Sequence, residues 1–169
     1  RRANIRGFGL EKLNLEQRED GSLVTDAALR TRFSNVLACG DVTGPFRFTH
    51  AASYQASTVA LNALVAPWWT FKVSYEYLPT CTFIDPEVAR VGLNVREAMA
   101  RGQEFDVYRY DVNSLDRALC DGETRGFIKV LTAKSGGKIL GATIVAPRAG
   151  EMLAEFVLAM RTNQGLSGI

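Results

Sequence analysis

The sequence has 169 residues, a formal net charge of +2 and a hydrophobic fraction of 47%. This length allows one ordinary domain or two small ones, and the apolar fraction is typical of chains that form a core. Acidic and basic residues are mixed along the chain without a basic stripe, so the charge pattern does not indicate nucleic-acid binding. No apolar run approaches the ~20 residues of a membrane span, so no membrane protein is indicated.

The cysteines, Cys39, Cys81 and Cys120, are isolated from one another. An odd number without C-x-x-C spacing indicates neither a disulfide framework nor a zinc site, and no other metal site is expected. We expect each cysteine to be a small buried hydrophobe in a reducing compartment, which favours the cytoplasm.

The first part of the chain contains two predicted strands. Residues 13–21 are polar and end in a predicted turn at Asp20-Gly21, and a strand is predicted over residues 23–25. An unbroken apolar run then leads to Gly40-Asp41, which is typical of a strand buried on both faces, predicted over residues 35–39. Ligands of open α/β sheets lie at the carboxyl ends of such strands. The alternative is a turn in which Asp41 caps a local group.

A helix is predicted over residues 50–64 and ends before Pro67. Thr49 is a suitable N-cap. Alanines recur at a spacing of three to four residues and predict one small packing face, made of Ala52, Ala56, Ala60 and Ala63.

The chain after residue 68 is predicted to form a second unit, of the α+β class. Strands are predicted over 80–83, 105–110, 126–133 and 138–146, the last two joined by a turn at Ser135-Gly136-Gly137. A capping-box pattern at Asn94 and Glu97 predicts a helix that ends at Gly102. A final helix is predicted over 150–163 with Gly165 as its cap. Its apolar face comprises Met152, Leu153, Phe156, Val157 and Met160.

The stretch from Thr31 to Asp41 resembles the second flavin-binding motif of the FAD-dependent pyridine nucleotide-disulfide oxidoreductases, T-x-x-x-x-[apolar]-[apolar]-A-x-G-D. The family includes dihydrolipoamide dehydrogenase, glutathione reductase and mercuric reductase. Residues 48–56 and 83–92 are most similar to the mercuric reductase branch. The second unit resembles the family's dimerisation domain, notably in Asp85-Pro86-Glu87-Val88-Ala89 and Ala149-Gly150-Glu151-Met152. The resemblance runs from Arg1 to about Ala159.

The resemblance implies a set of FAD contacts: Gly40, Asp41, Thr49 and His50. Asp41 would bind ribityl hydroxyls, and Gly40 would let the backbone approach the ligand. Thr49 would lie near a flavin carbonyl, and His50 would supply nearby backbone at a helix N-terminus that favours negative charge. His50 is the only histidine, but it does not match the family's catalytic histidine, which lies in an H-P-x-x-x-E segment. No catalytic residue is therefore predicted.

The resemblance also implies the organisation of the chain. Residues 1–68 would be the C-terminal remnant of an FAD/NAD(P)-binding region, and residues 69–169 a dimerisation domain, mixed α/β with a mainly antiparallel sheet, truncated before the catalytic His-Glu segment. There is no C-x-x-x-x-C redox pair and no G-x-G-x-x-G. We therefore expect the C-terminal part of a longer homodimeric enzyme that uses FAD and NADPH or NADH, inactive as a fragment. We also expect the first ~66 residues to be less well ordered or rearranged, because small pieces bury little surface.

Two alternatives stay open. The chain could be a self-contained, non-enzymatic dimerisation or binding module, which would fold entirely without flavin. The electron acceptor of the complete enzyme is also undetermined: a disulfide, dihydrolipoamide or a thiol-bound mercuric ion fits the resemblance.

Overall fold

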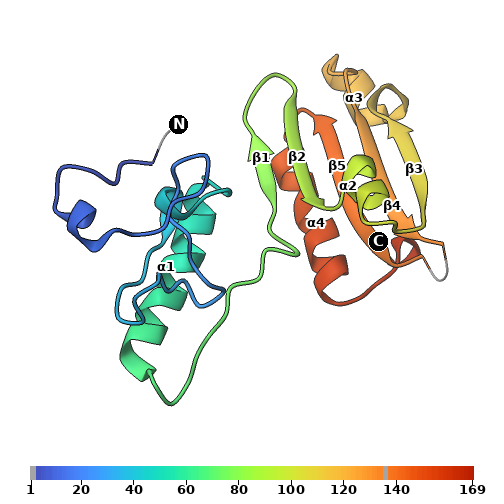
Figure 1. Ribbon diagram of the computed structural model, residues 1–169. Helices are drawn as coiled ribbons and strands as arrows, with labels where there is room; N and C mark the ends of the chain where they lie inside the picture. The colour runs from blue at the N-terminus through green and yellow to red at the C-terminus, as the bar shows by residue number, and fades with distance from the viewer. Residues whose placement is uncertain (1–2, 135–136) are drawn as a thin grey trace. The chain divides into compact units, whose positions relative to one another are not determined.

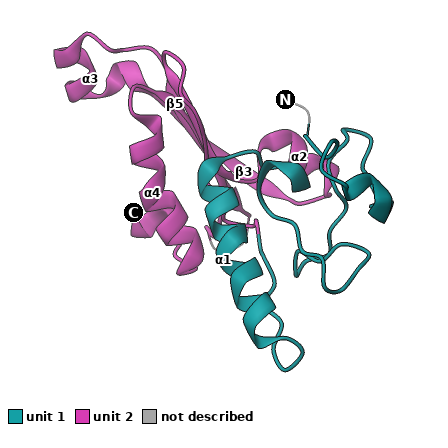
Figure 2. Ribbon diagram, turned by 90° about the vertical axis from the view of Figure 1, so that its left-hand side faces the viewer, with its two compact units in different colours: residues 1–74 teal, residues 75–169 magenta. Residues whose placement is uncertain are grey.

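The computed structural model describes residues 3–134 and 137–169, and the chain divides into two compact units, residues 1–74 and 75–169 (Figure 2). The predicted domain boundary after Trp68 stays a prediction, because a division of the fold into compact units does not define where a family domain starts.

The first unit consists of loops around one long helix. Its elements are the 3₁₀ turns η1 (Leu10–Leu13) and η2 (Gly40–Thr43) and the helix α1 (Thr49–Val65). Among its described residues the pairing is limited to isolated bridges, one of them between Arg30 and Leu37. The predicted strands over residues 23–25 and 35–39 are therefore wrong.

The reason lies in how residues 29–38 satisfy their backbone groups. Ala38 N–H donates to Leu29 C=O, and Thr31 N–H donates to Val36 C=O, so this segment folds back on itself. A strand buried on both faces needs neighbouring strands, and the described residues of this unit supply none. The apolar run of residues 36–39 is accordingly only half-buried.

Helix α1 confirms the prediction of a helix over residues 50–64, but its details differ. The N-cap is Phe48 and makes no side-chain cap bond, so Thr49 is the first helical residue and not the cap. The buried positions are Ala51, Gln55, Thr58 and Asn62. The predicted alanine face is wrong, since Ala56, Ala60 and Ala63 are exposed. Polar residues are buried instead: Gln55 and Asn62 hydrogen-bond the surrounding loops, and Thr58 Oγ1 donates to Tyr54 C=O of the same helix.

The second unit is built on a five-stranded sheet in the order β1-β2-β5-β4-β3, with every neighbouring pair antiparallel (Figure 1). The strands are β1 (Thr80–Thr82), β2 (Glu87–Gly92), β3 (Phe105–Asp111), β4 (Phe127–Ala133) and β5 (Ile139–Ala146). The α+β class and the mainly antiparallel sheet are confirmed. Strand β2 was not predicted. The predicted hairpin turn includes Ser135 and Gly136, which lie outside the described residues, whereas the pairing of β4 with β5 is confirmed.

Helix α4 (Ala149–Arg161) packs on β1, β2 and β5 and closes the core. Ala89, Val91 and Ile144 point to it from the sheet, and Leu153 and Met160 meet them from the helix. The predicted apolar face of this helix is confirmed, because its remaining members Met152, Phe156 and Val157 pack against the same cluster. The predicted cap at Gly165 is wrong: Asn163, at φ 57°, carries the left-handed conformation after the helix.

Two short helices complete the second unit. Helix α2 (Val95–Ala100) lies on the face of the sheet opposite α4 (Figures 1 and 2), and Gly102 follows it at φ +63° as predicted. Helix α3 (Asp116–Asp121) follows the 3₁₀ turn η3 (Val112–Ser114) and was not predicted. A further 3₁₀ turn, η4 (Leu166–Gly168), follows α4.

The capping box that starts α2 also connects it to the sheet. Asn94 Oδ1 accepts from Glu97 N–H at 2.9 Å, and the Glu97 carboxylate accepts from Asn94 N–H at 3.1 Å. Arg90 of β2 donates to both carboxylate oxygens of Glu97 at 2.7 Å. Burial opposes ionisation of Glu97, but the hydrogen bonds from Arg90 and Asn94 outweigh it and hold its pKa below the ordinary value of 4.5.

Replacing Glu97 with glutamine is expected to lower the free energy of unfolding at neutral pH by about 0.5–1 kcal/mol, a figure discounted for solvent screening of this half-buried pair. Since the folded-state pKa is lowered, the stabilisation is complete above the unfolded value and is lost as pH falls below about 4.5. Urea midpoints at pH 7 and pH 3 test this. A difference between the proteins that is as large at pH 3 as at pH 7 would contradict it.

Candidate functional site

The predicted site residues lie on two adjacent elements of the first unit. Gly40 and Asp41 begin the turn η2, and Thr49 and His50 begin helix α1. Gly40 has φ +81°, which favours glycine, and an added Cβ there would lie 3.6 Å from Ala52 Cβ, an ordinary contact. The conformation, and not a lack of space, is what calls for glycine at this position.

A buried side chain of α1 fixes the turn to the helix. Gln55 Oε1 accepts from Gly40 N–H at 2.6 Å and from Thr43 Oγ1 at 3.3 Å. Thr43 Oγ1 also lies 2.9 Å from Gly40 C=O, to which it can donate. Gln55 is 0% exposed and Thr43 is 2% exposed. This network positions Asp41 relative to the first turn of α1.

The site residues themselves face solvent. Asp41, Thr49 and His50 are all exposed, and the His50 ring stacks on Phe48 with centroids 5.5 Å apart. The first amides of a helix have no acceptor within the helix, and its N-terminus carries a partial positive charge. An exposed carboxylate beside such a helix start can accept hydrogen bonds from ligand hydroxyls, while the helix start accommodates an electron-rich group. These residues therefore fit a flavin with a ribityl chain.

Two polar residues of α1 were missed by sequence reasoning, Gln55 and Asn62. Asn62 Nδ2 donates to Ala28 C=O at 3.1 Å and to Phe71 C=O at 2.9 Å, and its Oδ1 accepts from Phe71 N–H at 2.7 Å. Their spacing with Ala51 and Thr58 was the available signal, since these residues form one helical face.

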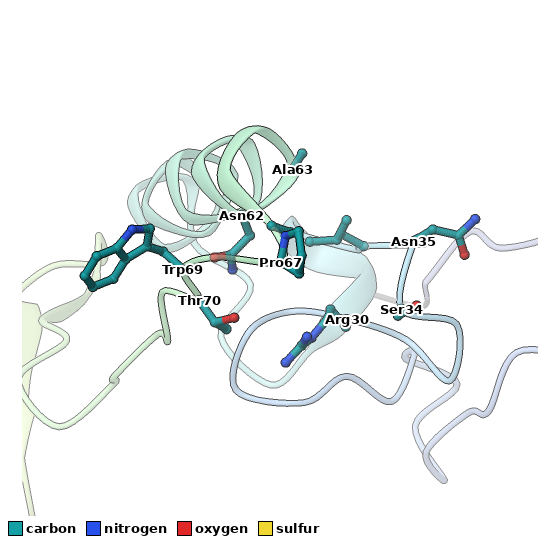
Figure 3. A pocket seen from close by; sticks show the side chains of 10 residues that line it. Arg30, Ser34, Asn35, Asn62, Ala63, Pro67, Trp69 and Thr70 are labelled. Atoms are coloured by element: carbon teal, nitrogen blue, oxygen red, sulfur yellow. The ribbon is translucent and has the colours of Figure 1, made fainter.

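A cleft of about 470 Å³ lies at the other end of α1 (Figure 3). Its lining includes Arg30, Asn62 and Trp69 but none of the predicted site residues. Arg30 is paired with Asp26 at 3.1 Å, and Asn62 is engaged with the loops. The cleft therefore does not extend the predicted flavin site.

Cys39, Cys81 and Cys120 carry free thiols. The expectation that they are buried is wrong: Cys39 and Cys81 are half-buried and Cys120 is exposed. Burial, followed by the charge of Glu87 and its hydrogen bond with the thiol, raises the pKa of Cys81, which disfavours the reactive thiolate. Across residues 3–134 and 137–169 no group of His, Cys, Asp and Glu could hold a metal ion. Likewise, none of the described helices has the length and apolar character needed to cross a bilayer.

Two family models match successive parts of the chain. The model described as "pyridine nucleotide-disulphide oxidoreductase" matches residues 1–56. The model described as "pyridine nucleotide-disulphide oxidoreductase, dimerisation domain" matches residues 78–167. The chain is 32% identical over 163 residues to dihydrolipoyl dehydrogenase of Chlamydia muridarum and to mercuric reductase of Acidithiobacillus ferrooxidans. In each case the match covers 96% of this chain, but only 34% and 29% of the relatives.

The solved structures agree at the level of the fold. An HOCl-induced flavoprotein disulfide reductase of Escherichia coli superposes with a TM-score of 0.83 at 23% identity, over 98% of this chain and 38% of that one. The chain thus spans about a third of the length of the relatives it matches. Since the dimerisation-domain model alone covers more than half of the residues, the chain belongs to the pyridine nucleotide-disulphide oxidoreductase family.

Proposed function

We propose that this chain is the C-terminal part of a flavin-dependent oxidoreductase that passes electrons from NADPH or NADH through FAD to a disulfide or a thiol-bound acceptor. The observation that carries the proposal is the order of the two family matches, which fall on the two compact units. The fragment contributes FAD contacts and a dimer interface and is inactive alone. The non-enzymatic module is not favoured, because both models describe an oxidoreductase.

Four residues would hold the cofactor: Gly40, Asp41, Thr49 and His50. When bound, FAD supplies reversible hydride and electron transfer. Asp41 accepts hydrogen bonds from the ribityl hydroxyls, and the positive φ of Gly40 gives the turn that presents this carboxylate. The first turn of α1, at Thr49 and His50, stabilises negative charge on the cofactor. Gln55 maintains the spacing of the turn and the helix through its hydrogen bonds.

In this proposal the second unit forms the interface of the homodimer. Its match to the dimerisation domain supports a homodimer of the complete protein. We place the protein in the cytoplasm, with no nucleic-acid or membrane partner. Its acceptor belongs to the class of disulfides and thiol-bound metal ions.

Replacing Asp41 with alanine in the full-length protein is expected to weaken FAD binding about ten-fold or more, because hydrogen bonds to a charged acceptor contribute roughly 1.5–3 kcal/mol. Titration of the apoprotein with FAD, followed by flavin fluorescence, measures this affinity. Disulfide-dependent oxidation of NADPH or NADH should fall in parallel at limiting FAD and recover at excess FAD.

The matched control is Glu19→Ala, which removes another exposed carboxylate of the same unit. It should leave FAD affinity unchanged. Equal affinities of the Asp41→Ala variant and the unmodified protein would remove Asp41 from the site. A full-length protein that binds no FAD at all would overturn the proposed function itself.

A further inference from the structure

The face of the sheet opposite α4 carries a cleft of about 520 Å³ between α2 and the strands. Its lining combines cations, polar groups and two apolar side chains: Arg90, Asn94, Val95, Arg96, Met99, Lys129 and Thr143. All of these residues belong to the second unit and lie far along the chain from the predicted flavin site. The proposed function makes no use of this cleft.

Strand pairing determines which side chains meet at its floor. Thr143 of β5 is paired with Arg90 on β2 and with Lys129 on β4. Directly paired residues of neighbouring strands place their side chains on the same face. A hydroxyl therefore lies between two cationic side chains in one row across the sheet.

The Thr143 hydroxyl is the unusual member of this row. Its Oγ1 is buried and has no hydrogen-bond partner, and it is the only such side-chain atom among the described residues. Buried polar groups are normally hydrogen-bonded, and leaving one unsatisfied is destabilising. A ligand that reaches this hydroxyl would supply the missing partner.

The charges around the cleft select the ligand's chemistry. The charge of Arg90 is neutralised by Glu97, because Arg90 donates to both carboxylate oxygens of Glu97 at 2.7 Å. Lys129 and Arg96, in contrast, have no ion pair with any carboxylate in the part of the chain that the structure describes. Lys129 contacts the Phe127 ring, with Nζ 5.7 Å from its centroid. The cleft thus presents two positive charges, those of Lys129 and Arg96, while the nearby Glu97 carboxylate is engaged by Arg90.

The walls add an apolar component. Met99 is 68% exposed beside the half-buried Val95, both on α2. Asn94 presents an amide group at the start of the same helix, its Oδ1 already accepting from Glu97 N–H. A ligand complementary to this cleft has a doubly charged oxyanion at one end and a small apolar group at the other.

We propose that this cleft binds a phosphomonoester with a small apolar substituent. The phosphate oxygens accept hydrogen bonds from Thr143 Oγ1 and charge-assisted bonds from Lys129 and Arg96. The substituent lies against Val95 and Met99. Long, flexible lysine and arginine side chains open the path to the hydroxyl with little cost in packing.

Phenyl phosphate is the probe, and inorganic phosphate tests the contribution of the apolar walls. In a titration of this chain followed by amide NMR, phenyl phosphate is expected to shift the amides of Asn94, Lys129 and Thr143 in a saturable way. Inorganic phosphate should shift the same amides with weaker affinity. Lys129→Met and Thr143→Val should each weaken phenyl phosphate binding about ten-fold.

Two further variants and an unfolding measurement on Thr143→Val make the test specific. Thr143→Ser keeps the hydroxyl and should retain binding. Thr143→Val should fold with a higher unfolding midpoint, because it removes an unsatisfied buried group. Lys134→Met, a matched loss of charge after β4, should leave the affinity unchanged. Shifts that do not saturate, or that are equal in the Lys129→Met and Lys134→Met variants, would overturn the proposal.

Discussion

Gly141→Ala is expected to destabilise the second unit by at least about 3 kcal/mol, because an added methyl group would overlap the backbone of a neighbouring strand. Gly141 of β5 is paired with Gly92 of β2. A Cβ at Gly141 would lie 2.1 Å from the carbonyl oxygen and 2.5 Å from the amide nitrogen of Leu93. Backbone atoms cannot rotate away as a side chain can, so the two strands would have to separate.

The same place holds the junction between β2 and helix α2. Leu93 N–H donates to Leu140 C=O at 2.9 Å, directly beside the glycine pair. Separation of the strands would break this bond and disturb Asn94, which caps α2. Since Val91 and Ala142 of the same strands belong to the core, the loss would extend to the packing of α4.

Urea unfolding of the chain, with hydrogen exchange resolved by peptide, measures the effect of Gly141→Ala. Exchange should accelerate in residues 75–169 and stay unchanged in residues 1–74. Gly122→Ala is the matched control: Gly122 has φ +70° but no atom within 4 Å of the added Cβ. It should cost only the backbone strain, about 1 kcal/mol. A loss for Gly141→Ala no larger than that for Gly122→Ala would show that the close approach of Leu93 to Gly141 does not determine the cost.

The features that the sequence predicted well are those set by local chemistry. The capping box at Asn94 and Glu97 determines where α2 starts, and the apolar spacing around Leu153 and Met160 determines the buried face of α4. Pro67 follows the end of α1 as expected. In each case the signal lies within a few residues of the structure it predicts.

Elements that depend on distant partners were harder to predict. Strand β2 has a short alternating pattern, with Ala89 and Val91 buried, and its pairing with β1 and β5 decides that it is a strand. Helix α3 is one short segment without a side-chain cap. The opposite error occurred at residues 36–39, where an apolar run typical of a buried strand has no neighbouring strand among the described residues and becomes part of a loop.

The candidate site illustrates the same limit. The residues that resemble a flavin motif, such as Asp41, could be named from their order in the chain. Gln55 could not, because a polar residue on a helix is normally exposed. Its burial is explained by a hydrogen bond to a distant residue. Gln55 Oε1 accepts from the amide of Gly40, which is fifteen positions away in sequence.

Gln55→Leu is expected to lower the free energy of unfolding of the first unit by about 1–3 kcal/mol, because it leaves the Gly40 N–H without its acceptor at a buried place. The Thr43 hydroxyl loses its 3.3 Å contact with Gln55 but keeps Gly40 C=O, 2.9 Å away, as an acceptor. Leucine has a similar volume, so the loss arises from the hydrogen bonds and not from a cavity. Turn η2 should detach from α1, and exchange of the amides in residues 39–44 should accelerate most.

Gln55 is fully buried, so we expect it to affect FAD binding only through the position of turn η2. In the full-length protein, Gln55→Leu should weaken FAD binding at least as much as Asp41→Ala, because it displaces the whole turn that carries the carboxylate. Gln103→Leu, at an exposed position of the second unit, is the control and should change neither quantity. If Gln55→Leu destabilises the first unit but leaves FAD affinity intact, the turn is structural, and the flavin contacts assigned to Gly40 and Asp41 are wrong.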